Sequence, residues 1–321
     1  MKITPAAFAS LRGEPGENVV ISGNNKGAGL TFVLLATLGW SLSGLFVRLM
    51  PELSGWQINA WRGLWLAISL LAWLILMHRG RLLEEFDKVP FWGLLISAFC
   101  FALGTTVYVL SLTLVNTAAV SVIGATSPLI TALLSPWLTG ERPHVLSWIA
   151  AFIALAGMAV IAQHGFASGN MLGLILSFGV PVTFAVQTLM LRRYRDHDMM
   201  TSICAGGFIS FLIASLASLF IGPAPVFAVS REHMLLLFAM GVIQLAVPLV
   251  FYGWGAKAVP AMTLSLVVML DAVFNPFWSW AFAGELPELA SVIGGAIILG
   301  AVALSIAAAA VFPQKPASIQ T

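Results

Sequence analysis

The sequence predicts an all-α integral membrane protein with ten transmembrane helices, arranged as two inverted five-helix repeats. Three observations lead to this fold class: an apolar composition, apolar runs of membrane-spanning length, and a motif that occurs twice. Hydrophobic residues make up 60% of the 321 positions and charged residues only 9%, with a mean hydropathy of +0.97. A soluble domain carries roughly a quarter charged residues. Most of this chain is therefore expected to lie in lipid.

Ten apolar runs are long enough to cross a hydrocarbon core of about 30 Å as helices. They lie at 28–50, 54–77, 90–114, 117–138, 145–163, 170–190, 201–221, 233–255, 260–283 and 289–311. The first run is too long for a signal-peptide core, so we expect it to be the first span. The mixed composition of residues 1–27 predicts a disordered cytoplasmic tail, and residues 312–321 are expected to form a second tail.

Basic residues in the short connections predict the orientation of the chain. If the N-terminus lies inside, the cytoplasmic side receives Lys2, Arg12, Lys26, Arg79, Arg81, Lys88, Arg142, Arg192, Arg193, Arg195, Lys257 and Lys315. The outer side receives only Arg48 and Arg231, and Arg62 lies within the second span. This bias predicts a multi-pass protein of the plasma membrane, the bacterial inner membrane, with both termini in the cytoplasm.

Reporter fusions test this orientation. Fusions at Arg195 and at the C-terminus should report the cytoplasm, whereas fusions near Ser168 and Ser230 should report the outer side. A C-terminus on the outer side would contradict the inverted arrangement of the repeats.

A four-residue motif indicates an internal duplication. Gly140-Glu141-Arg142-Pro143 is followed 144 positions later by Gly284-Glu285-Leu286-Pro287. The same offset aligns Tyr108 with Tyr252, Ser121 with Ser265, and Ser135 with Ser279. Repeats at 28–163 and 170–311 contain five predicted spans each, and an odd number inverts the second repeat in the membrane. Inverted repeats are typical of secondary transporters that work by alternating access around a central site.

Several motifs occur in an order and spacing that resemble a known family. They are Gly39-Trp40-Ser41, Trp61-Arg62, Ser127-Pro128 through Gly140-Glu141-Arg142-Pro143, and Leu270-Asp271 through Pro276-Phe277-Trp278 to Gly284-Glu285. Over residues 28–311 the chain resembles the drug/metabolite transporter superfamily, in its EamA-like branch with two tandem repeats. The resemblance implies a ten-helix fold that carries a small organic metabolite, with export as the expected direction.

Two charges of opposite sign are predicted at matching depth in the membrane. Arg62 lies about eight residues into its span and Asp271 about eleven, which places them roughly 12 and 16 Å deep. Because an unpaired charge in mid-membrane costs about 2.5–3.5 kcal/mol, their matching depth needs an explanation. They form either a site for substrate or protons, or a salt bridge that locks two helices, with Gln57 or Asn59 hydrogen-bonded to Arg62.

Two further groups of residues are candidates for conformational change. Glu141 and Glu285 are expected at opposite membrane boundaries, where water can reach them, as gate contacts or as caps of tight turns. Pro128, Pro181, Pro248 and Pro276 each remove one helical hydrogen bond, which frees the carbonyls of Gly124, Ser177, Gln244 and Ala272. Among them, Pro128 and Pro276 are the candidate hinges, although static bends are the alternative.

Aromatic residues predict both an interfacial belt and a binding site. Trp56, Trp92, Trp137 and Trp148 lie near span ends, as in a belt at the lipid headgroups. Trp40, Tyr108, Tyr252 and Trp278 lie deeper, where they either line a substrate cavity or pack within the bundle.

We expect no cofactor and no metal, because the five histidines lie at span edges or in loops and the two cysteines lie in apolar runs. The expected partners are a small-molecule metabolite, protons and the lipid bilayer, but no nucleic acid. Small residues in spans five and ten, such as Ala150, Ala154, Ala296 and Gly300, allow a monomer or a weak homodimer. A membrane-embedded lipid or prenyl transferase is the alternative, but the loops offer few groups for such an enzyme.

Overall fold

The computed structural model describes residues 23–77, 90–114, 117–161, 171–222, 224–274, 278 and 289–312, and within these residues the chain is helical with no strand. The helices of the first half are α2 (Gly23–Trp40), α3 (Ser43–Arg48), α4 (Gly55–Met77), α6 (Phe91–Leu114), α7 (Thr117–Gly124), α8 (Ser127–Leu138) and α9 (Val145–Ile161). Those of the second half are α10 (Met171–Arg193), α11 (Met200–Ile221), α12 (Arg231–Ala239), the π-helix η1 (Met240–Ala246), α13 (Val247–Ala258), α14 (Ala261–Val268) and α16 (Leu289–Val311).

The predicted all-α membrane protein is confirmed at the level of its helices. Seven described stretches are long and apolar enough to span a membrane: Gly27–Val47, Gly55–Met77, Phe91–Ser111, Met171–Arg193, Met200–Phe220, Arg231–Ala258 and Val292–Val311. Three predicted spans coincide with shorter apolar stretches, Val122–Leu138, Val145–Ile161 and Ala261–Phe274. Ten complete spans therefore stay a prediction.

Prolines explain two of the interruptions within spans. Pro128 has no N–H to donate, and its ring clashes with the carbonyl of Gly124. For this reason α7 ends at Gly124, and Pro128 lies at the start of α8. Pro248 follows the π-helix η1, whose wider turns absorb the loss of the hydrogen bond to Gln244. By contrast, Pro181 is buried in α10, which continues from Met171 to Arg193. Pro276 lies outside the described residues.

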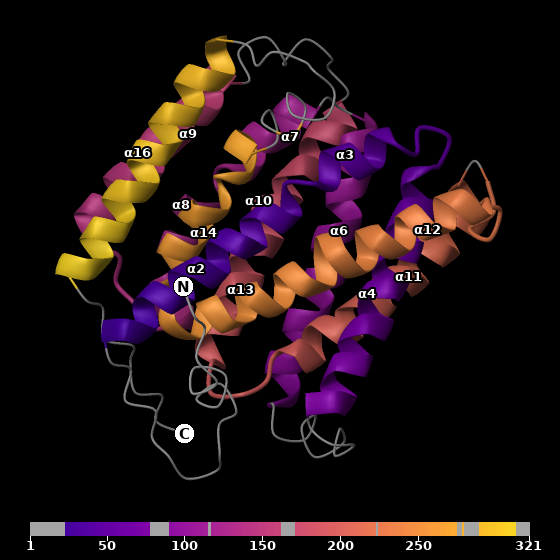
Figure 1. Cartoon of the computed structure of the whole chain (residues 1–321), viewed down its shortest axis with the longest axis horizontal. Coiled ribbons are helices and arrows are strands. Elements are labelled where there is room, and N and C mark those ends of the chain that lie inside the picture. The colour runs from indigo at the N-terminus through magenta and orange to yellow at the C-terminus, as the bar shows by residue number, and fades with distance from the viewer. Residues whose placement is uncertain are drawn as a thin grey trace.

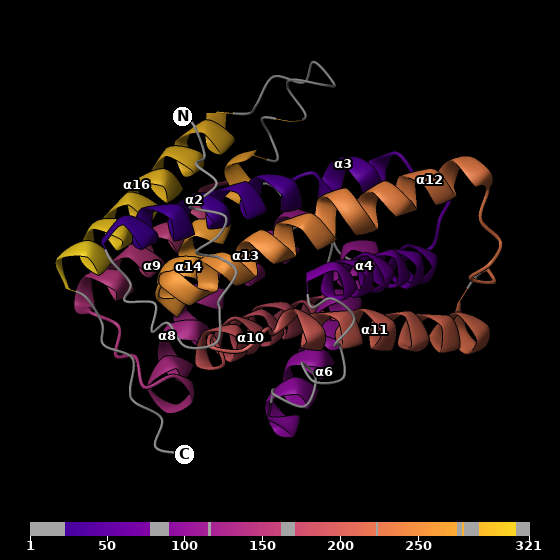
Figure 2. The same cartoon turned by 60° about the horizontal axis from the view of Figure 1, so that its bottom comes forward.

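The helices form a bundle in which segments far apart in sequence lie side by side. Figure 1 shows α9 and α16 paired along one edge of the molecule, and Figure 2 shows the same pairing from a second direction. On the other side α4 packs on α11, while α2 lies along α13 between these two pairs. One large buried apolar cluster crosses both halves, from Val33 in α2 to Val302 in α16. The two halves thus form one continuous core.

The helix contacts repeat with the period of the sequence duplication. The contact of α6 with α10 has its counterpart in that of α2 with α13, because α2 corresponds to α10 and α6 to the stretch from α12 to α13. In the same way, the contact of α6 with α11 matches that of η1 with α4, and the contact of α7 with α10 matches that of α14 with α2. Such exchange of equivalent helices is what a pseudo-two-fold axis between the halves produces.

Two equivalent glycines bring α4 and α11 into close approach. Gly63 and Gly207 are separated by the repeat offset, and a Cβ added to either one would lie 2.9 Å from the backbone oxygen of the other. Only residues without a side chain allow the backbones to approach this closely. The crossing fixes the position of Arg62, which directly precedes Gly63 in α4.

Candidate functional site

A small interior cavity lies where α3, α4, α6 and η1 meet. It has a volume of about 40 Å³, enough for roughly three water molecules at 10–15 Å³ each. Its lining residues are Ser43, Val47, Gly55, Ile58, Arg62, Tyr108, Val109 and Met240. Seven of these residues come from the first half, and Met240 comes from the second. The cavity therefore lies at a contact between the two halves.

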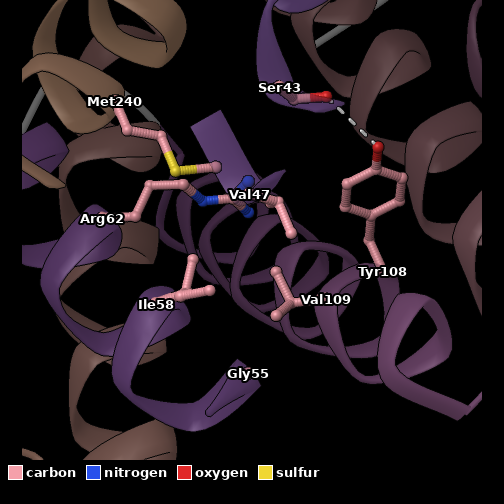
Figure 3. Close-up of a pocket in the computed structure, with 8 residues that line it drawn as sticks. All are labelled: Ser43, Val47, Gly55, Ile58, Arg62, Tyr108, Val109 and Met240. Atoms are coloured by element: carbon pink, nitrogen blue, oxygen red, sulfur yellow. Dashed lines mark hydrogen bonds between the residues drawn. The ribbon is translucent and has the colours of Figure 1, made fainter. Parts of the chain in front are cut away.

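Arg62 supplies the charge of this cavity. Its side chain is only 3% exposed, and it makes no hydrogen bond or ion pair within the described part of the chain. Figure 3 shows it extending past Met240 toward Val47, with Tyr108 facing Ser43 nearby. The hydroxyls of Ser43 and Tyr108 lie 3.5 Å apart, so each retains capacity for a further partner. The site combines an unpaired guanidinium with two hydroxyl groups.

The partners expected for Arg62 bind elsewhere. Gln57 donates through Nε2 to the carbonyls of Pro225 and Ala228 at 3.1 and 3.0 Å. Asn59 donates through Nδ2 to Oγ1 of Thr106 at 3.0 Å. Both amides therefore tie α4 to its neighbours and do not hold Arg62.

Asp271 also lacks the partner that a helix-locking salt bridge would require. No ion pair joins it to Arg62 among the described residues, and its buried Oδ1 has no hydrogen-bond partner. The residue follows α14 by three positions, in the short helical turn 271–274. The salt-bridge alternative is thus not what this structure contains.

The predicted aromatic site residues separate into two groups. Tyr108 lines the Arg62 cavity, whereas Trp40 and Tyr252 are not among its lining residues. The rings of Trp40 and Tyr252 lie 5.0 Å apart and both contact Phe184. Tyr252 also shares a 2.8 Å hydrogen bond with Thr188. Trp40 and Tyr252 therefore form a packed aromatic cluster beside α10.

Trp278 connects the segment after Asp271 to the break between α2 and α3. Its Nε1 donates to Oγ of Ser41 at 2.6 Å. Ser41 lies two residues before Ser43, which lines the cavity. The Asp271–Trp278 region and the Arg62 cavity are consequently linked through one short stretch of chain.

A buried ionic cluster joins the halves at one end of the bundle. Nε of Arg192 donates to Oε1 of Glu141 at 2.6 Å, and the two side chains are 7% and 2% exposed. Arg192 also donates through Nη1 to the carbonyls of Ala256 and Lys257, at 3.1 and 2.8 Å. Oε2 of Glu141 accepts from the N–H of Ala261 at 3.2 Å. We call these five residues the Glu141 cluster.

The cluster spans the repeats and corrects one expectation. Glu141 lies between α8 and α9, after Gly140 turns the chain with a φ of 70°, a conformation that favours glycine. Its partners come from the end of α10 and from the first residue of α14, both in the second half. Glu141 was expected within reach of water, but packing of three connections around it buries the carboxylate. Its counterpart Glu285 lies outside the described residues.

Sequence reasoning assigned no site role to Arg192, Ser43 or Met240. The repeat offset contains a signal for the first of these, since Arg192 corresponds to Arg48 just as Glu141 corresponds to Glu285. Ser43 and Met240 carry no comparable signal, because an ordinary serine and methionine acquire their positions only through packing. Among the described residues, no group of three or more His, Cys, Asp and Glu side chains could hold a metal ion.

Comparisons with known proteins agree with these observations. The EamA-like transporter family matches residues 27–163 and 171–307. Protein RarD of Streptomyces exfoliatus is 28% identical over 257 residues, covering 78% of this chain and 79% of RarD. The pseudopaline exporter CntI of Pseudomonas aeruginosa strain UCBPP-PA14 is 25% identical over 285 residues, covering 87% of this chain and 96% of CntI.

A solved structure supports the fold. A crystal structure of a chain with 18% sequence identity superposes with a TM-score of 0.75, covering 89% of this chain and 99% of the other. The family matches both halves, with a boundary where the duplicated motif predicts one. The chain belongs to the EamA-like transporter family, a branch of the drug/metabolite transporter superfamily.

Proposed function

We propose that this protein is a secondary carrier that moves a small organic metabolite across the membrane by alternating access. The observation that carries the proposal is the Glu141 cluster, a buried ionic contact between the two halves at one end of the bundle. A carrier must open and close each end of its site in turn, and contacts between inverted repeats are where such opening occurs. The Arg62 cavity supports a central site between the same halves.

The end that holds the Glu141 cluster is proposed to face the cytoplasm. Arg193, Arg195 and Lys257 lie at the same end as Arg192, and such an excess of basic residues favours the cytoplasmic side. In this orientation the structure represents a carrier whose cytoplasmic end is closed. Export is the proposed direction of transport, supported by the relative from Pseudomonas aeruginosa that is named an exporter.

The outer end is proposed to close through the equivalent residues. The repeat offset carries Glu141 to Glu285 and Arg192 to Arg48. We therefore propose that Glu285 and Arg48 form the outer gate contact when the Glu141 cluster breaks. Pro128, at the start of α8, and Pro276 are proposed as hinges beside the two gates. Membership of a transporter family favours a carrier over a membrane-embedded lipid or prenyl transferase.

Thiol labelling tests the proposed gate. Thr188 lies one helical turn deeper than Arg192 and is fully buried, so the thiol introduced by Thr188→Cys should be unreactive while the cluster is intact. In a Cys100→Ala background, adding Glu141→Gln should weaken the cluster and expose this introduced thiol to a membrane-impermeant maleimide applied from the cytoplasmic side. Peptide mapping measures the labelling at each cysteine.

Two controls make this result specific. The native Cys204 is 2% exposed, so its labelling would report unfolding and not gate opening. Arg195→Gln removes a charge from the same end, but the Arg195–Asp196 pair is long, at 3.9 Å, and its aspartate is 89% exposed. This change should leave the introduced thiol unreactive. Equal labelling of that thiol with and without Glu141→Gln would contradict a gate at this position.

A further inference from the structure

The repeat symmetry shows that the two mid-membrane charges are not needed for packing. The position equivalent to Arg62 in the second half is Gly206, and the position equivalent to Asp271 in the first half is Ser127. A Cβ at Gly206 would lie 2.7 Å from the carbonyl oxygen of Ala98, so this position packs backbone against backbone. The fold thus accommodates the equivalent positions without any charge. Arg62 is an addition to one repeat only.

Arg62 is buried in a state that leaves its charge uncompensated. The side chain is only 3% exposed and makes no hydrogen bond or ion pair in the described chain. An arginine inside a membrane protein normally pairs with an acid or with carbonyl groups. The described residues around Arg62 supply neither an acid nor a carbonyl group as a partner. A bound anion would therefore provide the negative charge that pairs with the guanidinium.

The geometry around Arg62 selects the chemistry of that molecule. A guanidinium is planar and presents parallel N–H groups that match an oxyanion in a bidentate contact. The hydroxyls of Tyr108 and Ser43, which lie 3.5 Å apart beside the same cavity, add donors for an anion's oxygen atoms. The remaining lining residues are apolar or glycine, so the cavity has no negative group of its own among the described residues.

Asp271 is a negative charge near the Arg62 cavity that would act on a bound anion. Tyr108 lies within electrostatic range of both Arg62 and Asp271, so the carboxylate of Asp271 is near the site. Asp271 does not line the cavity and forms no ion pair with Arg62. A carboxylate in this position repels an anion at Arg62, which predicts that its neutralisation strengthens anion binding.

We propose that Arg62, Tyr108 and Ser43 form an oxyanion subsite, and that the carried metabolite is an organic anion whose carboxylate or phosphate group binds there. The inference rests on the proposed function, since it names the substrate class of that same carrier. A volume of about 40 Å³ holds only a few waters, so the subsite accommodates the anionic group and the rest of the metabolite enters when the halves separate.

Ligand-dependent thermal stability of the purified protein tests the proposal. The probes are the carboxylates glutarate and citrate, the phosphate monoester glycerol phosphate, and the cations putrescine and spermidine. Saturable stabilisation by the carboxylates, by the phosphate ester or by both is expected, and the pattern distinguishes the two oxyanions. Stabilisation by the cations to the same degree, or by no anion, would overturn the proposal.

Variants then assign the effect to Arg62. Arg62→Gln is expected to weaken binding of the active anion at least about thirtyfold, and Arg62→Lys to retain part of the affinity because it keeps the charge but loses the planar fork. Asp271→Asn is expected to tighten binding, and Arg195→Gln, at the surface, to leave it unchanged. Unchanged affinity in Arg62→Gln, or weaker binding in Asp271→Asn, would contradict the subsite.

This measurement separates the inference from the function on which it rests. Thermal stabilisation reports binding without transport. An anion that binds through Arg62 but is not moved into liposomes containing the carrier would overturn the proposed carriage and leave the subsite intact. Carriage of a cation, with no effect of Arg62→Gln on its affinity, would overturn the oxyanion subsite and leave the proposed carrier function intact.

Discussion

Replacement of Arg192 by Ala is expected to lower the free energy of unfolding by about 3–5 kcal/mol, because it leaves the carboxylate of Glu141 buried without its cation. Glu141 is 2% exposed, and among the described residues its carboxylate would keep only the hydrogen bond from the N–H of Ala261. The loss also removes the donors to the carbonyls of Ala256 and Lys257. Reversible unfolding in mixed detergent micelles measures the effect.

A double mutant separates the cost of an orphaned charge from the value of the pair. Glu141→Gln with Arg192→Leu leaves no buried charge, and the glutamine can still accept from Ala261. This variant should be more stable than Arg192→Ala alone, since the two changes are coupled through one contact. Arg195→Ala, which removes an exposed ion pair at the same end, should change stability by less than about 0.5 kcal/mol. Strict additivity of Glu141→Gln and Arg192→Leu, each measured alone and then together, would show that the two charges do not depend on each other.

Adding one methyl group at the crossing of α4 and α11 is expected to destabilise the protein by about 1–3 kcal/mol. In Gly63→Ala the new Cβ would lie 2.9 Å from the carbonyl oxygen of Gly207 and 3.3 Å from Cβ of Ser210. Because the nearest atom belongs to the backbone, the clash can be relieved only if the helices separate. Gly207→Ala meets the carbonyl of Gly63 at the same distance and should have a similar effect.

Gly300→Ala is the matched control, since a Cβ at this position in α16 meets no atom within 4 Å. It should be neutral or slightly stabilising, because alanine forms helix better than glycine. The double change Gly63→Ala with Gly207→Ala should cost less than the sum of the two single changes, as both separate the same helices. If Gly63→Ala and Gly300→Ala had the same free energy of unfolding, α4 and α11 would not be in backbone contact at this crossing.

The sequence by itself was sufficient for the membrane class and the duplication. Each of these rests on local properties: an apolar run must be long enough to cross a bilayer, and a repeated motif is visible without knowing any contact. The proline at Pro128 likewise ends α7 by a local steric effect. The break between α2 and α3 in the first predicted span was not predicted, although Ser41, Ser43 and Gly44 beside it are weaker helix formers than the leucines of that span.

The tertiary structure decided what these residues contact. Arg192 and Glu141 are 51 positions apart, and the N–H that completes the cluster is 120 positions beyond Glu141. Matching depth suggested that Arg62 and Asp271 could pair, but depth fixes one coordinate only, and packing left each of them without the other. A hydrogen bond or an ion pair requires two groups within a few ångströms in all three dimensions. That condition is met only when helices from both repeats have packed, which is why the unpaired Arg62 and the buried Glu141 could be recognised only in the folded chain.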